Sequence, residues 1–229
     1  MNIAGVDGCP GGWFYAAVEK GRTSWGVVAD VDALMRRLRP PRLVAIDIPI
    51  GLPDAGPRAC DQEARRALGR RGSSVFPAPV RPVLEAGDYE DACRIRRKVE
   101  GKAMSRQAWH IVPRIASVDR WLRQCPERAA ELVEVHPELC FREMAGGPLA
   151  WPKRRPRGRQ ERLELLRPFF RNTPDAALGW RRGRAVAADD VLDAFAALWS
   201  AKRIVEGRAL CMPGLPPRDR FGLPMRIMA

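Results

Sequence analysis

Acidic residues carry the clearest chemical signal in this sequence. Asp7 ends a short apolar run, Asp47 interrupts a second one, and Glu134 lies in a third. Isolated carboxylates are costly to bury in such segments. Asp190 and Asp193 are three residues apart and share one face of a predicted helix. Carboxylates that folding brings together repel one another, and oxygen-rich clusters suit Mg²⁺ or Mn²⁺. These five residues are therefore the predicted metal ligands and catalytic groups.

Most of these acids also have a structural interpretation, which the sequence leaves open. Asp7 and Asp47 could each cap or form a local turn, as aspartate often does at the end of a strand. Glu134 could form an ion pair with an arginine. Asp190 could belong to the first turn of its helix, where negative charge suits the helix dipole. Asp193 lies a full turn further in, so capping does not explain it.

Other kinds of site lack their motifs. The glycine-rich turn GCPGG at 8–12 does not have the Gly-Lys-Ser/Thr ending of a phosphate-binding loop. No G-x-S-x-G is present, so a Ser-His-Asp triad has no nucleophile elbow. The six cysteines lie far apart without a C-x-x-C pair, which argues against a zinc ribbon or a redox dithiol. His136 is a candidate metal or substrate ligand, although a single histidine at a strand end is more often structural.

The chain is strongly basic, with a formal net charge of +13 over 229 residues. Residues 153–171 contain eight arginines or lysines against two glutamates. A positive field of this kind attracts phosphate-rich partners and makes their binding salt-dependent. An arginine-rich, lysine-poor composition is also typical of GC-rich genomes, so the charge alone does not establish a nucleic-acid partner.

The hydrophobic pattern predicts an α/β protein. Three strands close together in the sequence favour antiparallel pairing, and a later apolar run is typical of a buried parallel strand. The predicted strands are 2–7, 13–18, 24–29, 43–48, 131–135 and 225–228. The predicted helices are 31–38, 58–71, 83–99, 105–124, 161–170 and 189–206, and 145–160 is predicted to be a mobile basic loop. The economical interpretation is one domain over 1–229 with a mainly helical insertion at about 58–125.

Seven motifs in order along the chain carry a family resemblance. They are GVDGCPGGW (5–13), IDIPIGLP (46–53), the Arg58-x-Cys-Asp-x-x-Ala-Arg-x-x-Leu-Gly run, SSVFPAPVRP (73–82), Ser105-Arg106-Gln107, EVHPELCF (134–141) and DDVLDAFAALWSA (189–201). The chain resembles the family catalogued as domain of unknown function 429, predicted to be nucleases of the ribonuclease-H-like superfamily. That resemblance implies a ribonuclease-H-like mixed sheet, with a three-strand antiparallel meander plus parallel strands, flanked by helices.

The superfamily resemblance implies two-metal phosphodiester hydrolysis, in which two ions activate a water and stabilise the leaving oxygen. Asp7 matches the acid on the first strand that would bridge both ions. Asp47 or Glu134 matches the acid on the second strand, and the sequence does not rank them. Asp190 and Asp193 resemble the helix pair seen in junction-resolving relatives.

Substrate contacts are expected in the family-like segments that do not look like core. The glycine-rich turn after Asp7 also resembles that of the sugar-kinase and actin group, which contacts nucleotide phosphates. Arginines could hold substrate phosphates, although Arg65 is equally well explained as a solvated helix residue. The candidate substrate-binding residues are Gly8, Arg58, Arg65, Ser73, Ser74, Arg81, Gln107 and His136.

The sequence thus favours a Mg²⁺- or Mn²⁺-dependent nuclease whose partner is nucleic acid or a nucleotide. One alternative is an enzyme of phosphoryl chemistry on a nucleotide or small molecule, and another is a non-catalytic protein that binds nucleic acid or a protein partner. No apolar run approaches the roughly 20 residues that span a bilayer, and no basic segment followed by an apolar one opens the chain. We therefore expect a cytoplasmic protein without a membrane partner.

Overall fold

The computed structural model describes residues 2–38 and 43–229, which divide into two compact units. The first unit consists of Met1–Asp47, Ala130–Leu210 and Met228–Ala229. The second consists of Ile48–Ala129 and Cys211–Ile227. The helical insertion predicted at about 58–125 lies within the second unit, which also contains a segment from near the C-terminus.

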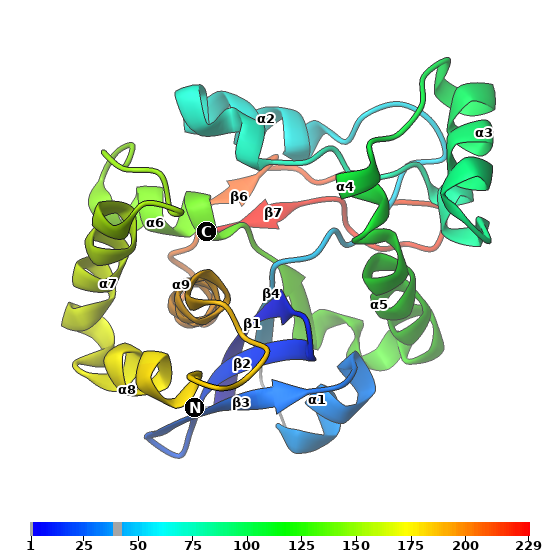
Figure 1. Cartoon of the computed structure of the whole chain (residues 1–229). Helices are drawn as coiled ribbons and strands as arrows, with labels where there is room; N and C mark the ends of the chain where they lie inside the picture. The colour runs from blue at the N-terminus through cyan, green and yellow to red at the C-terminus, as the bar shows by residue number, and fades with distance from the viewer. Residues whose placement is uncertain (1, 39–42) are drawn as a thin grey trace. The chain divides into compact units, whose positions relative to one another are not determined.

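The first unit is built on a five-stranded mixed sheet with the strand order β3-β2-β1-β4-β5 (Figure 1). Neighbouring strands β1, β2 and β3 are antiparallel, whereas β4 and β5 are parallel to β1. Their bounds are β1 Asn2–Cys9, β2 Gly12–Glu19, β3 Arg22–Val28, β4 Leu43–Ile46 and β5 Leu132–Glu134. The α/β class, the antiparallel meander and the added parallel strands are as predicted.

Helix α9 (Ala188–Val205) packs against β1, β2 and β4 and is largely buried. Figure 1 shows it end-on, between the sheet and helices α6, α7 and α8. Eleven consecutive residues, from Val191 to Ala201, are buried. A helix that is apolar on every side must be covered on every side, and α6, α7 and α8 contact its other faces.

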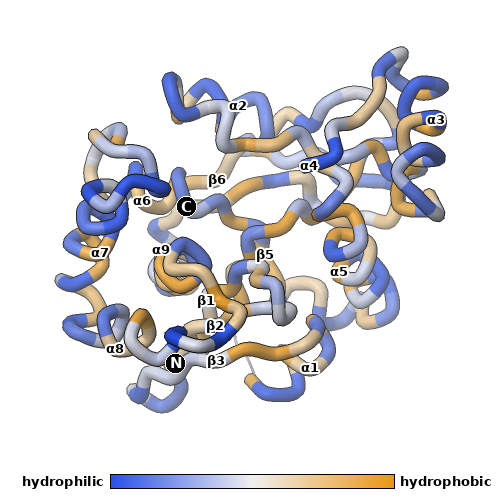
Figure 2. The backbone as a smooth tube through the Cα atoms, in the orientation of Figure 1, coloured by the Kyte–Doolittle hydropathy of each residue, from blue (hydrophilic) through white to orange (hydrophobic). Residues whose placement is uncertain are grey.

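The remaining helices of the first unit are α1 Val31–Arg37, α6 Pro137–Ala145, α7 Pro156–Phe170 and α8 Thr173–Trp180. Helix α7 carries both hydrophilic and hydrophobic colours along its length in Figure 2, as expected for a helix with one face on the core. The basic loop predicted over 145–160 is too long, because α7 already begins at Pro156. Proline suits the first turn of a helix, where its missing N–H costs nothing.

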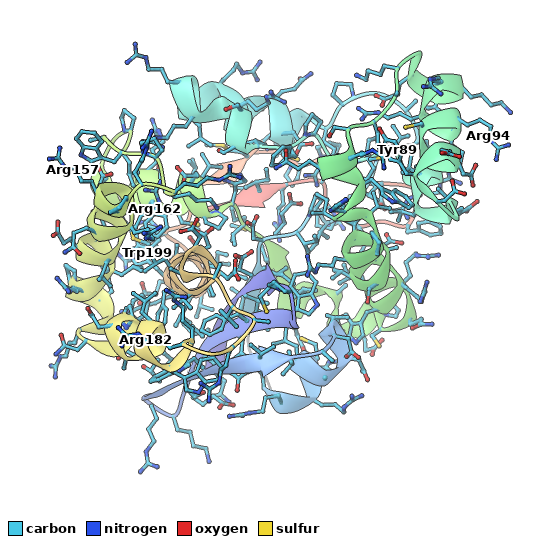
Figure 3. All side chains as sticks on the ribbon, viewed as in Figure 1. Tyr89, Arg94, Arg157, Arg162, Arg182 and Trp199 are labelled. Carbon is cyan, nitrogen blue, oxygen red and sulfur yellow. The ribbon has the colours of Figure 1, made fainter. Side chains whose placement is uncertain are left out.

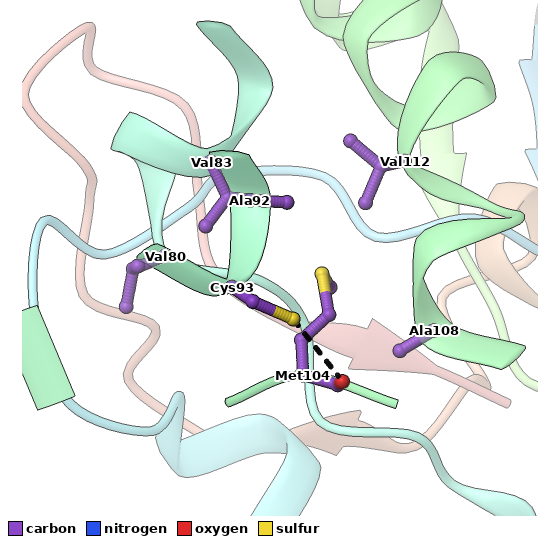
Figure 4. Close-up of a cluster of buried hydrophobic side chains, with 7 residues drawn as sticks. All are labelled: Val80, Val83, Ala92, Cys93, Met104, Ala108 and Val112. Carbon is purple, nitrogen blue, oxygen red and sulfur yellow. Dashed lines mark hydrogen bonds between the residues drawn. The ribbon is translucent and has the colours of Figure 1, made fainter. Parts of the chain in front are cut away.

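The second unit is mainly helical. Its helices are α2 Ala59–Leu68, α3 Tyr89–Glu100, α4 Arg106–Trp109 and α5 Val112–Gln124, and it also contains the 3₁₀ segments Gly69–Ser74 and Arg81–Glu85. The short strand β6 Cys211–Met212 pairs with β7 Ile227–Met228. A third 3₁₀ segment, Pro126–Glu131, leads along the chain into β5. One of its cores gathers seven buried residues from the segment 80–112 (Figure 4). The helix predicted over 83–99 begins later, at Tyr89, with Asp88 capping its first turn.

Among the described residues, no helix is long and apolar enough to cross a membrane. All six cysteines are free thiols.

Candidate functional site

The register of the sheet brings Asp7 and Asp47 side by side. Val6 pairs with Ile46 across the parallel strands β1 and β4, so the next residue of each strand is an aspartate. The Asp47 backbone N–H donates to the Val6 carbonyl at 3.0 Å, which continues the ladder to this point. Because the two strands are parallel and in register, both side chains leave the sheet on the same face.

That face is the one covered by α9. A Cβ placed on Gly5, two residues before Asp7, would lie 1.9 Å from the Leu198 backbone nitrogen and 2.2 Å from the Ala194 carbonyl oxygen. Side chains two apart on a strand share a face, so Asp7 also points toward α9. The absence of a side chain at Gly5 lets strand and helix approach closely. Asp193 comes from the neighbouring turn of α9 and adds the third carboxylate.

Glu134 does not join this group. It pairs with Ile46 in the parallel register of β4 and β5, so its side chain leaves the sheet on the face opposite to Asp47. Glu134 is buried, with 5% of its surface exposed. Of the two candidates for the second-strand acid, the structure therefore places Asp47, and not Glu134, beside Asp7.

Burial and mutual repulsion disturb the acid–base behaviour of the paired aspartates. Burial is the largest cause that raises the pKa of Asp7 well above its usual value, and the charges of Asp47, Asp193 and Asp190 raise it further. Burial likewise raises the pKa of Asp47 to about 6, with a contribution from Asp193 and an opposing one from His136. Shifts of this kind on a cluster of carboxylates are typical of functional sites.

Asp193 and Lys153 form the one direct ion pair within this cluster among the described residues. The Lys153 ammonium nitrogen lies 2.7 Å from Asp193 Oδ2, and only 2% of the aspartate side chain is exposed against 39% of the lysine side chain. Asp193 Oδ1 is buried and has no hydrogen-bond partner in the described part of the chain. The charge of Asp193 is the main reason why the pKa of Lys153 is raised, so the ammonium stays charged. We call Asp7, Asp47, Asp193 and Lys153 the acidic cluster.

Asp190 caps the N-terminus of α9, as its position in the first turn of that helix allows. Its Oδ2 accepts a hydrogen bond of 2.7 Å from the backbone N–H of Ala187, at the start of α9. Burial raises its pKa, and this hydrogen bond works against that rise. Asp190 caps the helix and stands at the edge of the acidic cluster, where its charge still acts on Asp7.

His136 immediately precedes α6 and acts electrostatically on Asp47. The positive charge that it can carry is the largest influence lowering the pKa of Asp47. Glu138, in the first turn of α6, acts on Asp47 in the opposite direction and forms an ion pair with Arg162 at 2.5 Å. His136, predicted as a substrate contact, is thus adjacent to the acidic cluster.

The donor chemistry of the cluster fits a divalent cation. Its ligand atoms are carboxylate oxygens, which Mg²⁺ and Mn²⁺ prefer, and the partnerless Asp193 Oδ1 is a buried atom that a cation would satisfy. Within residues 2–38 and 43–229, no three His, Cys, Asp or Glu side chains are arranged to hold a metal ion. The Lys153 ammonium takes the other oxygen of Asp193 instead.

The glycine-rich turn shapes a hairpin. Cys9 and Gly12 pair at the end of β1 and β2, which leaves Pro10 and Gly11 as a two-residue turn. Gly12 has a φ of +122°, and a Cβ there would lie 2.3 Å from the Val28 carbonyl oxygen, so only glycine fits. The Gly8 N–H, a predicted phosphate contact, donates to Asp7 Oδ1 at 2.8 Å. In this conformation it orients Asp7.

The other predicted substrate residues belong to the second unit. Arg58 is 2% exposed and bonds Asp61 together with the carbonyls of Ile50 and Gly51. Arg81 is 7% exposed and bonds Asp119 and Asp219. These buried ion pairs give both arginines a structural role, contrary to the expectation that they do not belong to the core. Four residues are at least partly exposed, which leaves a substrate role for them a prediction: Arg65, Ser73, Ser74 and Gln107.

Lys153 is the functional candidate that the sequence did not single out. It lies in the segment predicted to be a mobile basic loop, among arginines that are exposed. Its one local signal is a lysine within an otherwise arginine-rich run. Its contact with Asp193 spans 40 residues of sequence, which no local pattern reveals.

Comparisons with known proteins give one match. A scan against protein-family models matched residues 5–218 to the family described as "Protein of unknown function (DUF429)". No curated protein and no solved structure matched significantly.

Proposed function

Because the chain belongs to the DUF429 family, whose description gives no activity, we propose its function from the acidic cluster: a hydrolase of phosphodiester bonds in nucleic acid that depends on Mg²⁺ or Mn²⁺. The proposal includes a ribonuclease-H-like arrangement of the sheet. The single observation that carries it is the under-neutralised set of three carboxylates, which share the ammonium of Lys153.

Electrostatics favours a cation at this place. When all three carboxylates are ionised, Lys153 is in direct contact with Asp193 alone, and Asp7 and Asp47 are left to the weaker influence of Lys153 and His136 in surroundings where burial already penalises charge. A fold gains nothing in stability from such an arrangement, since buried charges contribute favourably only when they are paired. An oxygen-binding divalent ion neutralises these carboxylates and adds a positive centre for a phosphate group.

Each residue of the cluster has a role in this proposal. Asp7, Asp47 and Asp193 would hold the ion, which when bound supplies a nucleophilic water and neutralises charge on the phosphate. Gly8 orients the Asp7 carboxylate through its backbone N–H. Lys153 keeps one oxygen of Asp193 neutralised in the free protein and brings a positive charge to the position where an anionic substrate would arrive.

Incubation with end-labelled nucleic acids tests the proposal. Single-stranded, duplex and branched DNA and RNA are incubated with wild-type protein in Mg²⁺, Mn²⁺ or EDTA, and products are separated on gels. We expect cleavage that requires the divalent ion and falls about 10²- to 10³-fold in Asp7→Asn, because removal of a principal electrostatic group costs about this much. Asp175→Asn removes an exposed acid of the same unit and serves as the control with unchanged activity.

Two results contradict the proposal in different ways. Cleavage that persists in Asp7→Asn excludes the acidic cluster as the catalytic site. Absence of cleavage by the wild-type protein on every polymer, combined with ion-dependent hydrolysis of mononucleotides, replaces the nuclease with an enzyme of nucleotide phosphoryl chemistry.

A further inference from the structure

The segment 149–155 of the first unit combines an exposed aromatic ring with the lysine of the acidic cluster. All seven tryptophans lie in the described part of the chain, and Trp151 is the exposed one among them, at 43%. Trp13, for comparison, is 3% exposed. The Arg157 guanidinium stands 5.1 Å from the centre of the Trp151 ring. Two residues after this tryptophan, Lys153 bonds Asp193.

Two side chains of α7 hydrogen-bond the backbone at Trp151, one to its N–H group and one to its carbonyl oxygen. The Glu161 carboxylate accepts hydrogen bonds from the Ala150 N–H at 2.7 Å and from the Trp151 N–H at 3.0 Å. The Arg162 guanidinium, 1% exposed, donates to the Trp151 carbonyl at 3.1 Å. Arg162 is itself fixed by Glu138, and Figure 3 shows its side chain inside the unit while Arg157 reaches outward.

A glycine of α7 makes this attachment possible. A Cβ on Gly158 would lie 2.0 Å from the Pro152 carbonyl oxygen, so the segment and the helix touch through backbone atoms alone. The structure therefore uses a buried ion pair, three hydrogen bonds between side chains and backbone, and a close backbone approach to fix a ring that faces solvent. A mobile surface loop needs none of these, and core packing does not require them because the ring is exposed.

Positive charge surrounds the ring. Arg154, Arg155 and Arg157 are exposed, and Arg159 is partly exposed one turn into α7. An extended chain advances at most about 3.6 Å per residue, which keeps the Trp151 backbone within about 7 Å of the Lys153 backbone. The residue that carries the exposed ring is therefore a close neighbour, along the chain, of the residue that reaches the acidic cluster.

We propose that the segment 149–155 binds single-stranded nucleic acid, with Trp151 stacking on one unpaired base and the neighbouring arginines holding the strand's phosphates. An aromatic face with a basic surrounding is the usual platform for unpaired bases. A duplex keeps its bases stacked inside and offers no free face to the ring. That the bound strand leads its phosphate to the acidic cluster rests on the proposed function, whereas the binding itself does not.

Fluorescence anisotropy with labelled 12-nucleotide oligo-dT, oligo-U and a 12-base-pair duplex tests this proposal. The titrations are made in EDTA, so that no cleavage interferes. We expect the wild-type protein to prefer single strands to the duplex. Stacking by one aromatic residue corresponds to an affinity loss of about 5- to 150-fold on replacement by alanine. Trp151→Ala should show this loss and Trp151→Phe, which retains a ring, should recover most of it.

Two further variants make the result specific. Phe169→Ala removes another exposed ring of the same unit, 51% exposed, and should leave affinity unchanged. Arg157→Ala should lower the slope of log affinity against log salt by about 0.7, as expected for one phosphate contact on a single strand. Thermal melting of each variant verifies that it is folded.

Equal affinity of Trp151→Ala and wild type, or tighter binding of the duplex, overturns the proposal. The arms with DNA and RNA show which polymer supplies the strand. The two proposals fail separately: a protein that binds strands through Trp151 but cleaves nothing in Mg²⁺ or Mn²⁺ refutes the hydrolase and leaves the binding segment intact. Ion-dependent cleavage together with unchanged binding in Trp151→Ala refutes the binding segment and leaves the hydrolase intact.

Discussion

Buried aspartates occur in both units of this protein and are neutralised in different ways. In the second unit each of them faces an arginine: Asp61 lies 2.5 Å from Arg58, and Asp119 lies 3.0 Å from Arg81. Asp219 bonds Arg81 as well and also accepts backbone N–H groups from 52, 221 and 223. Every one of these carboxylates has a cation at hydrogen-bond distance.

In the first unit three carboxylates converge on the single ammonium of Lys153. The charge of Asp47 raises the pKa of Asp7, and the charge of Asp193 raises the pKa of both. Asp193 leaves one buried oxygen without a partner among the described residues. The neighbouring strands β2 and β3 pair in regular register up to Trp13 and Val28. The deficit of positive charge therefore belongs to the carboxylates themselves and does not reflect an irregular sheet around them.

The difference separates two uses of buried charge. A fully paired carboxylate fixes the position of the segments it joins, and its loss leaves an uncompensated arginine. An under-neutralised cluster destabilises the fold, and a protein keeps such strain where it serves binding or catalysis. The same substitution, aspartate to asparagine, should therefore have opposite effects on stability in the two units.

The largest effect is expected in the second unit, from Asp219→Asn. The variant leaves the buried Arg81 with a missing charge partner, and breaking a buried ion pair costs about 3–5 kcal/mol of unfolding free energy. Urea titration followed by circular dichroism measures the loss. Asp54→Asn is the matched control, because its pair with Arg220 is exposed on both sides and surface pairs contribute about 0–1 kcal/mol. Equal losses in the two variants would show that burial does not distinguish these pairs.

The second effect concerns the contact that brings the acidic cluster together. Gly5→Ala places a methyl group 1.9 Å from a backbone atom of α9, and a well-packed core absorbs such a group only by shifting, at about 2–3 kcal/mol. Urea titration should show this loss. Gly179→Ala in α8 is the control: no atom lies within 4 Å of its added Cβ, and the change should be neutral or stabilising by up to about 1 kcal/mol. A Gly5→Ala protein as stable as wild type would mean that α9 does not pack this closely on β1.

The comparison between the units also shows what the sequence could reveal. The sequence singles out Asp7 and Asp47 because each is a carboxylate at the end of, or within, an apolar run, where an isolated charge is costly to bury. The choice between Asp47 and Glu134 was not possible, because a register shift of one residue moves a side chain to the other face. An apolar pattern locates the end of a strand only to within one or two residues, which is too coarse to decide the face on which a side chain lies.

The roles of Arg81 and Lys153 could not be predicted from the sequence, because each depends on a partner far away along the chain. Arg81 looked available for substrate because its partner Asp219 is 138 residues away in the sequence. Lys153 looked like one more charge in a loop, since the Arg162–Glu138 pair that organises its surroundings joins α7 to α6. Local patterns indicate which residues are unusual. Which cation neutralises which acid is decided only by the packed structure.

A third, smaller effect has the opposite sign and depends on pH. Folding raises the pKa of Asp47 from 3.8 to about 6, so the folded protein holds this proton more tightly and loses stability as pH rises from about 4 to 6. Asp47→Asn removes the titration. Its unfolding free energy relative to wild type should increase by about 1–2 kcal/mol between pH 4 and pH 7, a value reduced from the full shift because Asp47 is partly exposed.

Urea titrations at pH 4, 5, 6 and 7 measure this difference. Asp175→Asn, an exposed acid of the same unit paired with Arg167 at 2.8 Å, is the control, with an expected change of less than about 0.5 kcal/mol. If the difference in unfolding free energy between Asp47→Asn and wild type stays constant across this range, ionisation of Asp47 does not destabilise the folded protein.

The smallest effect joins the electrostatic comparison to the proposed function. If the acidic cluster lacks positive charge, a divalent cation should supply it, and binding to the folded protein alone adds about 1.4 kcal/mol at an ion concentration of about ten times Kd. Thermal unfolding in EDTA and in Mg²⁺ or Mn²⁺ measures this gain without reference to activity. Asp193→Asn removes the negative charge and one of the two carboxylate oxygens at the position of the partnerless Oδ1 and should abolish the gain, whereas Asp175→Asn should retain it. The same gain in Asp193→Asn would place the ion elsewhere, and no gain in the wild-type protein would mean that Lys153 is all the compensation that these three carboxylates receive.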